Sequence, residues 1–387
     1  MNLTQDPRTE ANAPAWCVFA GGGTGGHLCP ALAIVHELQR LDREVSVSFL
    51  CTDRPIDRHI LGEAGLEALP QGVRPFSMKP WRWPGFYLAW RRAIRRCDEL
   101  FARRQPAVVV GAGGYASGPA LRAALARGKP TAILNPDLVP GRANRWFAGR
   151  VDRVFAQWED SAAYLPGARG FRPWGCPVRP GFLAPREQLR AAGLARFGLS
   201  PERRTLLVTG ASQGARTING AIAALAPEIA RSGDWQLLHL AGNADAERMQ
   251  AAHQDAGVPS TVLAFTDHMP EAMAVADLAV SRAGASTLAE LTAIGLPSIL
   301  LPYPFHRDQH QRRNAEVLER AGAARIVEDR IDVEANASAL RGTLLPLLQS
   351  PHELVGMAEA ARRIGRPDAA TRIAAELLAM AGRNTDN

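Results

Sequence analysis

The feature that most constrains this chain is a glycine-rich loop near its start. Residues 21–27 read Gly-Gly-Gly-Thr-Gly-Gly-His, and they separate a short apolar run at 16–20 from a helical pattern that begins near Pro30. A strand that turns through glycines into a helix points backbone N–H groups and the positive end of the helix dipole at one spot, which suits a diphosphate. Glycine permits this because the backbone can then approach the anion closely and adopt positive φ.

The same arrangement occurs twice more along the chain. Gly111–Pro119 follows the apolar run 107–110, and Gly210–Ala215 follows the apolar run 205–209. A single loop of this kind could be a plain connector, and its spacing fits neither the Walker pattern nor the ordinary dinucleotide fingerprint. Three strand–glycine–helix junctions in one chain favour anion binding over simple connection.

Short apolar runs alternate with helical patterns along most of the sequence. The expected strands of the first half are 15–20, 45–51, 107–111, 130–134, 152–156 and 171–174, with helices near 30–41, 55–64, 86–104, 118–127 and 141–149. A second series of strands is expected at 205–209, 235–240, 261–264, 277–280, 297–301 and 324–327. This alternation predicts the α/β class, with parallel doubly wound sheets that bind ligands at the carboxyl ends of their strands.

Prolines and glycines between residues 173 and 185 divide the chain into two halves. We therefore expect two Rossmann-like domains facing each other across a cleft. The expected parts are a disordered tail over 1–14, an N-terminal domain over 15–178, a linker over 179–200, a C-terminal domain over 201–365 and a helix over 366–387. That last helix could cross back onto the first domain.

Charge and composition narrow the class of partner. The net charge of +7 and the pI near 9.6 favour anionic partners such as phosphorylated substrates, nucleic acid or an acidic membrane surface. No nucleic-acid-binding signature accompanies the charge, so nucleic acid is not an expected partner. The five cysteines are scattered without a Cys-x-x-Cys pair, and we expect neither disulfides nor a metal site. We expect no membrane span and no signal peptide, because long apolar runs are missing.

Several shorter motifs accompany the glycine loops, and the whole set spans residues 17 to about 327. They are Gly175-Cys176-Pro177-Val178-Arg179, the run from Ser281 to Leu291, and His310-Gln311 with Asn314-Ala315. Together with the three loops, they resemble the MurG family of N-acetylglucosaminyltransferases, which completes lipid II in peptidoglycan synthesis. The resemblance implies a GT-B fold and an inverting transfer, without metal or cofactor, from UDP-N-acetylglucosamine to lipid I, a polyprenyl-diphosphate sugar.

The donor-binding residues that the resemblance implies lie mostly in the second half. Glu290 lies on a predicted helix, and the small residues that open this helix could hold the nucleotide diphosphate while the carboxylate accepts the ribose hydroxyls. A surface glutamate that only stabilises its helix is the alternative. The implied donor contacts are Arg179, Ser212, Gln213, Phe265, Thr266, Ala285, Ser286, Thr287, Glu290, His310 and Gln311. Phe265 could equally belong to the core, and Arg179 to a solvated linker.

His27 closes the first glycine loop and is the best candidate for the base that deprotonates the acceptor hydroxyl. Its unperturbed pKa lies near 6.5, and a helix N-terminus lowers that pKa further, which favours the neutral form. The alternative is that His27 only hydrogen-bonds the acceptor or its own loop. The expected contacts of the acceptor diphosphate and sugar are Thr24, Gly25, Gly26, Gly113, Gly114, Tyr115, Ser117, Asn135 and Asn144.

One segment departs from the family pattern. Where the family has His-Glu-Gln-Asn, residues 134–137 of this chain read Leu-Asn-Pro-Asp. We expect Asp137 to take over part of the acid–base work, as a carboxylate beside a sugar can. A different acceptor or reduced activity are the alternatives. The departure leaves the donor-binding half untouched.

Residues 74–105 combine cations with aromatic side chains. The stretch holds nine lysines and arginines against two acids, interleaved with Phe76, Met78, Trp81, Trp83, Phe86, Tyr87, Leu88 and Trp90. Aromatic side chains beside basic residues can lie at a lipid interface, where the cations attract anionic head groups. The resemblance to the MurG family implies a lipid acceptor that is taken up through a basic and apolar patch of the first domain. We therefore expect residues 74–96 to dock on anionic lipids of the inner membrane and the protein to be cytoplasmic and peripheral. An amphipathic helix with part of its aromatics in the core is the alternative, and stacking on single-stranded nucleic acid is another.

Three other functions stay open on sequence grounds. The first is a GT-B transferase for another lipid acceptor, to which the altered segment 134–137 points. The second is a UDP-sugar 2-epimerase, which would turn over a UDP-sugar without an acceptor. The third is a nucleotide-sugar-binding protein that has lost transfer chemistry and would bind UDP without forming product.

Overall fold

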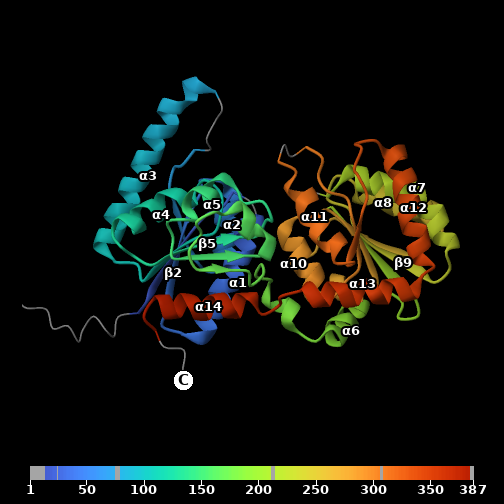
Figure 1. Ribbon diagram of the computed structural model, residues 1–387. Helices are drawn as coiled ribbons and strands as arrows, with labels where there is room; N and C mark the ends of the chain where they lie inside the picture. Colours follow the sequence, from blue (N-terminus) through green and yellow to red (C-terminus); the bar gives the residue numbers. More distant parts are fainter. Residues whose placement is uncertain (1–13, 24, 75–78, 211–213, 306–307, 384–387) are drawn as a thin grey trace, which may run out of the picture. The chain divides into compact units, whose positions relative to one another are not determined.

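The protein was analysed as a computed structural model, which describes residues 14–23, 25–74, 79–210, 214–305 and 308–383. The chain forms two compact α/β units (Figure 1). Unit 1 takes the described residues up to Arg179 together with those from Asp368 onward, and unit 2 takes Pro180–Pro367. The N-terminal tail expected over 1–14 lies almost entirely outside the described residues.

Unit 1 is built on a parallel sheet with the strand order β3-β2-β1-β4-β5-β6-β7. Its strands are β1 (Trp16–Ala20), β2 (Ser46–Cys51), β3 (Glu67–Pro70), β4 (Val108–Gly111), β5 (Thr131–Asn135), β6 (Arg153–Ala156) and β7 (Phe171–Arg172). Phe19 pairs with Phe49 on one side of β1 and with Val110 on the other. The central strands are apolar along their length because helices cover both faces of the sheet.

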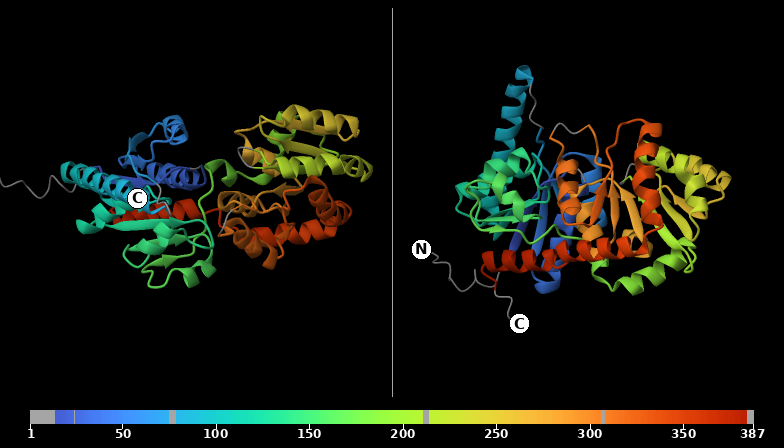
Figure 2. Two further views of the ribbon diagram at one scale, coloured as in Figure 1. Left: turned by 90° about the horizontal axis from the view of Figure 1, so that it is seen from above. Right: turned by 45° about the vertical axis from the view of Figure 1, so that its right-hand side comes forward.

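The helices of unit 1 form two layers. They are α1 (Gly25–Leu41), α2 (Pro55–Glu63), α3 (Trp83–Arg103), α4 (Ser117–Ala126), α5 (Arg142–Phe147) and α14 (Ala369–Met380), with 3₁₀ turns at Pro80–Arg82 and Glu159–Tyr164. One core cluster joins the sheet to α1 and α14, and a second joins it to α3, α4 and α5. Figure 2 shows these layers from two further directions.

Two features of unit 1 differ from the sequence analysis. β3 was not predicted, because four residues at the sheet edge that end in Pro70 carry no strand pattern. α1 begins at Gly25 and not near Pro30, so Pro30 lies inside the helix. His27 therefore lies in the first turn of α1.

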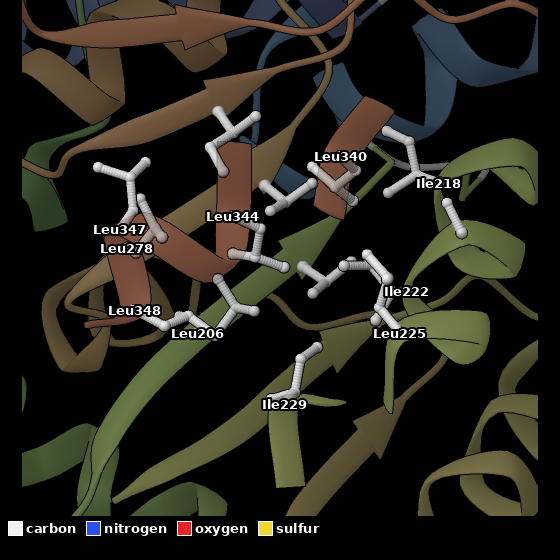
Figure 3. Close-up of a cluster of buried hydrophobic side chains, with 14 of the residues drawn as sticks. Leu206, Ile218, Ile222, Leu225, Ile229, Leu278, Leu340, Leu344, Leu347 and Leu348 are labelled. Atoms are coloured by element: carbon white, nitrogen blue, oxygen red, sulfur yellow. The ribbon is translucent and has the colours of Figure 1, made fainter. Parts of the chain in front are cut away.

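Unit 2 repeats the plan with the parallel strand order β10-β9-β8-β11-β12-β13. Its strands are β8 (Arg204–Thr209), β9 (Trp235–Leu240), β10 (Ser260–Leu263), β11 (Leu278–Ser281), β12 (Ser298–Leu300) and β13 (Ala324–Ile326). Its helices are α6 (Arg186–Phe197), α7 (Arg216–Arg231), α8 (Ala246–Asp255), α9 (Met269–Val275), α10 (Ala285–Ile294), α11 (His310–Arg320), α12 (Val333–Leu348) and α13 (Pro351–Ile364), with a 3₁₀ turn at Pro180–Leu183. Aliphatic side chains of α7 and α12 pack over β8 and β11 (Figure 3).

The segments that the sequence assigns to a linker and to a C-terminal helix each pack on one unit. α6 lies against α9 in unit 2, where Arg186 donates to the Ala276 carbonyl at 2.8 Å. α14 lies against α1 in unit 1 and buries Ile373 and Leu377. Thr371 of α14 donates a hydrogen bond to Glu37 of α1 at 2.9 Å, which fixes the helix in register.

In each sheet the strand order reverses next to glycine loops. In unit 1 the reversal falls between β1 and β4, and in unit 2 between β8 and β11. Ligands of doubly wound sheets bind outside the carboxyl ends of the strands at such a switch point. Each of the three glycine loops follows one of these strands, so both switch points carry a glycine loop.

Candidate active site

A small pocket opens at the carboxyl end of the unit 1 sheet. It is lined by Gly26, His27, Pro30, Ala112, Leu134, Asn135, Pro136, Phe155, Gly175, Cys176, Pro177 and Ile373. These residues come from the start of α1, from the ends of β4 to β6, from the segment after β7 and from α14. The pocket thus brings together the glycine loop that contains His27, the start of the loop after β4 and the altered segment 134–137.

The His27 ring lies against the second glycine loop. A side chain at Gly113 would place its Cβ 2.6 Å from His27 Cδ2, so only glycine allows the ring this close. Gly113 and Gly114 also have φ of +107° and +74°, which disfavour any other residue. One ring nitrogen of His27 donates a hydrogen bond to the Gly22 carbonyl. The imidazole is therefore held between the loops that follow β1 and β4.

The surroundings of His27 lower its pKa below the usual value for histidine. Burial is the largest cause, because the protein replaces water that would stabilise the charged ring. The carboxylate of Asp137, the Gly22 carbonyl and the carboxylate of Asp57 each raise the pKa, but they do not offset burial. A neutral ring that donates through one nitrogen keeps a basic lone pair on the other, as a general base requires.

Asn135 and Asn144 hold the altered segment in shape. The Asn135 amide donates to the Asp137 carbonyl at 2.8 Å, and the Asn144 amide donates to the Leu134 carbonyl at 2.8 Å and to Asn135 Oδ1 at 3.1 Å. Both side chains are buried, and only Asn135 lines the pocket. These bonds tie α5 to the end of β5 and keep Asp137 close enough to act on His27.

The other predicted acceptor contacts fall into different places. Ser117 donates to the Gly114 carbonyl at 2.8 Å and closes the second loop from inside the protein. Tyr115 packs with Val73, Ala93 and Ala116 beside α3, and neither Tyr115 nor Ser117 lines the pocket. Gly25 is the first residue of α1, and Thr24 lies outside the described residues.

In unit 2, Gln311 joins two loops at the carboxyl end of the sheet. Its Oε1 accepts hydrogen bonds from the backbone N–H of Ala283 at 3.2 Å and of Tyr303 at 2.9 Å. The side-chain oxygen is thus occupied by the protein, and the amide N–H groups are the part of Gln311 that can hydrogen-bond a sugar. Beside it, His310 Nε2 lies 2.6 Å from Asp308 Oδ2. The buried Nδ1 of His310 has no hydrogen-bond partner among the residues that the structure describes.

Glu290 lies in the second turn of α10, behind the N-terminal turn formed by Ala285, Ser286 and Thr287. It is only 8% exposed, so it is not the surface glutamate of the alternative interpretation. The N-cap of α10 is Gly284, which supplies no side-chain cap, and the N-terminus of a helix is a place where backbone amides can bind an anion. This turn and Glu290 lie on the helix that follows β11, at the switch point of the unit 2 sheet.

The remaining donor candidates are less clearly assembled. Phe265 is 57% exposed after β10, so it does not belong to the core. Thr266 is buried, and its hydroxyl accepts a hydrogen bond from the backbone N–H of His268 at 3.1 Å. Arg179 is the last residue of unit 1 before the chain enters unit 2. Ser212 and Gln213 lie outside the described residues.

A buried ion pair that the sequence analysis did not single out joins segments at the carboxyl end of the unit 2 sheet. Arg282 Nη1 lies 2.7 Å from Asp329 Oδ2, and Arg282 also donates to the Leu301 carbonyl and to the Thr217 hydroxyl. Thr217 in turn donates to Asp329 at 2.7 Å. The network joins the start of α7, the loop after β11 and the end of β12, which all lie at the carboxyl end of the strands.

The stretch around α3 exposes several large apolar side chains. Trp81 is 74% exposed, and Trp83, Tyr87 and Leu88 are each about half exposed. Phe86 stacks instead on Trp90, whose ring lies against Gly118 of α4. The first half of α3 stands away from the sheet of unit 1 in Figure 1. Phe76 and Met78 lie outside the described residues.

Cations surround the exposed side chains of α3. Lys79 Nζ lies 5.7 Å from the centre of the Trp81 ring, and Arg91 lies at the same distance from the Tyr87 ring.

None of the helices in the described part of the chain has the length and apolarity of a membrane span. Within the described ranges, no three His, Cys, Asp or Glu residues gather in a way that could hold a metal ion.

Comparison with known families assigns the two units to one class of enzyme. Residues 17–156 match the N-terminal domain of glycosyltransferase family 28, and residues 205–373 match its C-terminal domain. The protein is therefore a two-domain glycosyltransferase of family 28.

Comparison with individual proteins narrows the family. A UDP-N-acetylglucosamine--N-acetylmuramyl-(pentapeptide) pyrophosphoryl-undecaprenol N-acetylglucosamine transferase of Desulforamulus reducens is 35% identical over 91% of this chain and 95% of its own. The enzyme of the same name from Nocardioides is 37% identical over 92% of this chain and 96% of its own. The crystal structure of Acinetobacter baumannii MurG matches with a TM-score of 0.74 and 25% identity, over 95% of this chain and all of that one. The chain belongs to the MurG family.

These matches confirm the predicted GT-B fold class with two Rossmann-like domains. A UDP-GlcNAc 2-epimerase from Neisseria meningitidis shares the fold, with a TM-score of 0.67 and 17% identity over 95% of this chain and 99% of its own. At that identity the likeness concerns the fold alone.

Proposed function

We propose that this protein transfers N-acetylglucosamine from UDP-N-acetylglucosamine to lipid I and so makes lipid II. The relatives that are 35–37% identical over more than nine-tenths of the chain carry this activity in their names. The observation that carries the proposal is the position of His27, a neutral imidazole at the switch point of unit 1 between two glycine loops. A family-28 enzyme needs a base for its acceptor at such a place.

His27 acts as the general base in this proposal. Its second ring nitrogen accepts the proton of the acceptor hydroxyl as that oxygen attacks the anomeric carbon of the donor sugar. The bond between the anomeric carbon and the UDP oxygen breaks at the same time, and UDP leaves with the bonding electrons, which inverts the anomeric centre. Asp137 raises the pKa of His27 and thereby stabilises the imidazolium that forms.

Unit 2 holds the donor. The N-terminal turn of α10 receives the UDP diphosphate, and the buried Glu290 accepts the two ribose hydroxyls. His310 and the amide N–H groups of Gln311 bind the sugar hydroxyls. Backbone groups of Phe265 and Thr266 bind the uracil. Arg179 neutralises phosphate charge, while Ser212 and Gln213 contact the donor phosphate and sugar. Helix amides and cations stabilise the charge that develops on the leaving UDP.

Unit 1 holds the acceptor and carries it from the membrane. The loops that end at Gly26 and Gly114 receive the lipid diphosphate beside His27. The exposed side chains Trp81, Trp83, Tyr87 and Leu88 enter the interface of the inner membrane on its cytoplasmic side, and the surrounding lysine and arginine residues bind its anionic lipids. A lipid-linked sugar is then taken up without leaving the bilayer.

A transfer assay tests the proposal. Purified protein, radiolabelled UDP-N-acetylglucosamine and lipid I in detergent micelles are expected to give a labelled lipid product that comigrates with lipid II. His27→Ala should abolish most of this product, whereas His253→Gln, a buried histidine of unit 2, should leave it at neutral pH. No lipid product from the unaltered protein would refute the proposal. Appearance of the label in the 2-epimer of UDP-N-acetylglucosamine would indicate that the protein is a UDP-sugar 2-epimerase.

The altered segment favours a second candidate, a transferase for another lipid-linked sugar. Leu134 and Pro136 line the pocket beside His27, where the family pattern has polar residues. An apolar lining at this point suits an acceptor with fewer hydrogen-bonding groups next to the reacting hydroxyl. Transfer to a different polyprenyl-diphosphate sugar, at a higher kcat/KM than to lipid I, would identify this candidate.

A further inference from the structure

A buried carboxylate lies directly behind the first glycine loop. Asp57, in the first turn of α2, is fully buried. Its two oxygens accept the backbone N–H of Gly23 at 2.8 and 3.0 Å. Asp57 Oδ2 also accepts the backbone N–H of Thr52 at 3.1 Å and the Thr52 hydroxyl at 2.5 Å. The carboxylate therefore pulls the loop and the end of β2 together.

The loop is shaped to receive this carboxylate. A Cβ at Gly22 would lie 2.4 Å from Asp57 Oδ2, and the φ of Gly22 is +132°, so no other residue fits there. On the far side of the next peptide, Arg54 Nη1 donates to the Gly23 carbonyl at 2.8 Å. Both polar groups of Gly23 are thus held by side chains of the segment that follows β2.

Gly22 also connects Asp57 to His27. The Gly22 carbonyl accepts the hydrogen bond from the His27 ring, and Gly22 itself lies against the Asp57 carboxylate. We propose that Asp57 is the positioning residue for His27: by fixing Gly22 and Gly23, it keeps the Gly22 carbonyl where it selects one tautomer and one orientation of the imidazole. This inference rests on the proposed function and adds a residue for which no role was predicted from the sequence.

Only a carboxylate satisfies this position. Asp57 receives N–H donors from Gly23 and from Thr52 on its two oxygens. An asparagine has one accepting oxygen, so its NH₂ group would face one of these N–H donors. A buried donor would then lose its partner, which is costly enough to displace a glycine loop. Asp57→Asn is therefore expected to release the loop while it changes the shape of the side chain very little.

A double-mutant cycle tests the proposal through the transfer rate. Asp57→Asn is expected to lower kcat about 10- to 100-fold in the unaltered background, because small misplacements of a catalytic group cost rates of this order. In the His27→Ala background, the same substitution should change kcat less than about twofold, since the group it positions is already gone. Glu63→Gln is the matched control, because it removes an exposed carboxylate from the same helix and should leave kcat unchanged.

Two results would overturn the proposal. One is an equal loss of rate from Asp57→Asn with and without His27, which would mean that Asp57 acts on the fold in general. The other is a fully active Asp57→Asn protein. Should Asp57→Asn fail to fold, Thr52→Val takes its place, because it removes one donor to Asp57 without altering the loop. It should lower kcat several-fold with the same dependence on His27.

An NMR measurement separates this inference from the proposed function. Nitrogen-15 shifts of the His27 ring are expected to show a single neutral tautomer in the unaltered protein and a mixture of tautomers in Asp57→Asn. This readout needs no substrate, so it holds even if the unaltered protein makes no lipid II. An unchanged tautomer in folded Asp57→Asn would contradict the role of Asp57.

Discussion

The two units hold segments at the carboxyl ends of their sheets in opposite ways. In unit 1 an acid accepts backbone N–H groups, since Asp57 binds Gly23 and Thr52. In unit 2 a cation donates hydrogen bonds instead: Arg282 donates to the Leu301 carbonyl, and the carboxylate of Asp329 balances its charge. The first arrangement leaves a titratable ring facing a pocket, whereas the second gives a rigid frame around a helix N-terminus. The difference agrees with the proposal that unit 1 carries the catalytic base and unit 2 binds the donor.

The histidines of the two units sharpen this contrast. His239 and His253 of unit 2 are fully buried, with Nδ1 of the first 2.9 Å from Nε2 of the second. Burial lowers the pKa of His239 to about 3 and that of His253 to about 4. Both lie away from the switch point, in the layer between β9 and α8. A lowered pKa alone therefore does not single out a base, and the proposal for His27 depends also on its place beside a pocket at the switch point of unit 1.

The largest expected effect is on catalysis in unit 1. His27→Ala should lower the transfer rate about 10²- to 10⁴-fold, because a general base contributes about that much. The rate should also fall as the pH drops below about 6.5, because the lowered pKa of His27 places its protonation there. Steady-state kinetics between pH 5 and 8 measure both. Retained activity in His27→Ala would remove the distinction between the two units.

The next effect concerns the ion pair of unit 2. Asp329→Ala should lower the free energy of unfolding by about 3–5 kcal/mol, because it leaves the buried Arg282 without its partner. Arg325→Gln breaks an exposed pair with Glu353 in the same unit and should cost at most about 1 kcal/mol. Urea unfolding compares the two variants. Equal losses would mean that the buried network is no more than a surface contact.

The buried pair His239 and His253 predicts that the free energy of unfolding of unit 2 decreases at acidic pH. Both folded pKa values lie below the unfolded value, so the pair binds protons only after unfolding. The free energy of unfolding should be flat above about pH 6.5 and then decline toward pH 4, by about 1.4 kcal/mol per pH unit for each histidine. Urea unfolding across this range should show a shallower decline in His253→Gln. An unchanged slope would contradict the assignment.

The smallest expected effect concerns the membrane-docking surface that we propose for unit 1. Trp81→Ala should weaken binding to vesicles that contain phosphatidylglycerol by about 1–2 kcal/mol, or roughly five- to thirtyfold, because an exposed indole loses its place in the interface. Trp146→Ala is the control, since Trp146 is also exposed and lies under an arginine, but on α5. Sedimentation with vesicles measures both. Equal weakening by the two substitutions would argue against docking through α3.

Local patterns in the sequence predicted the glycine loops and, apart from β3, the strands of both sheets. Buried strands read as apolar runs, and the glycine loops stand directly after them, so adjacent residues suffice for the prediction. His27 and Glu290 were singled out as site candidates in the same way, because each is part of a short motif.

The contacts that support these loops could not be predicted, because they join distant parts of the chain. Asp57 and Gly23 are 34 positions apart, and Thr217 and Asp329 are 112 apart. Gln311 was predicted to bind the sugar, but no local pattern indicates that its oxygen already accepts Ala283 and Tyr303. The sequence also left open whether Phe265 is exposed, because the residues around it are brought together only by folding.

Calorimetric titration with UDP tests most directly the proposal that unit 2 binds the donor while unit 1 carries the catalytic base. The unaltered protein should bind one UDP, and Glu290→Ala should weaken that binding by about 1.5–3 kcal/mol, the worth of hydrogen bonds to a charged group. His27→Ala and Asp57→Asn should bind UDP as the unaltered protein does, although neither transfers sugar well. Absence of UDP binding by the unaltered protein, or equal weakening by the unit 1 substitutions, would contradict the account.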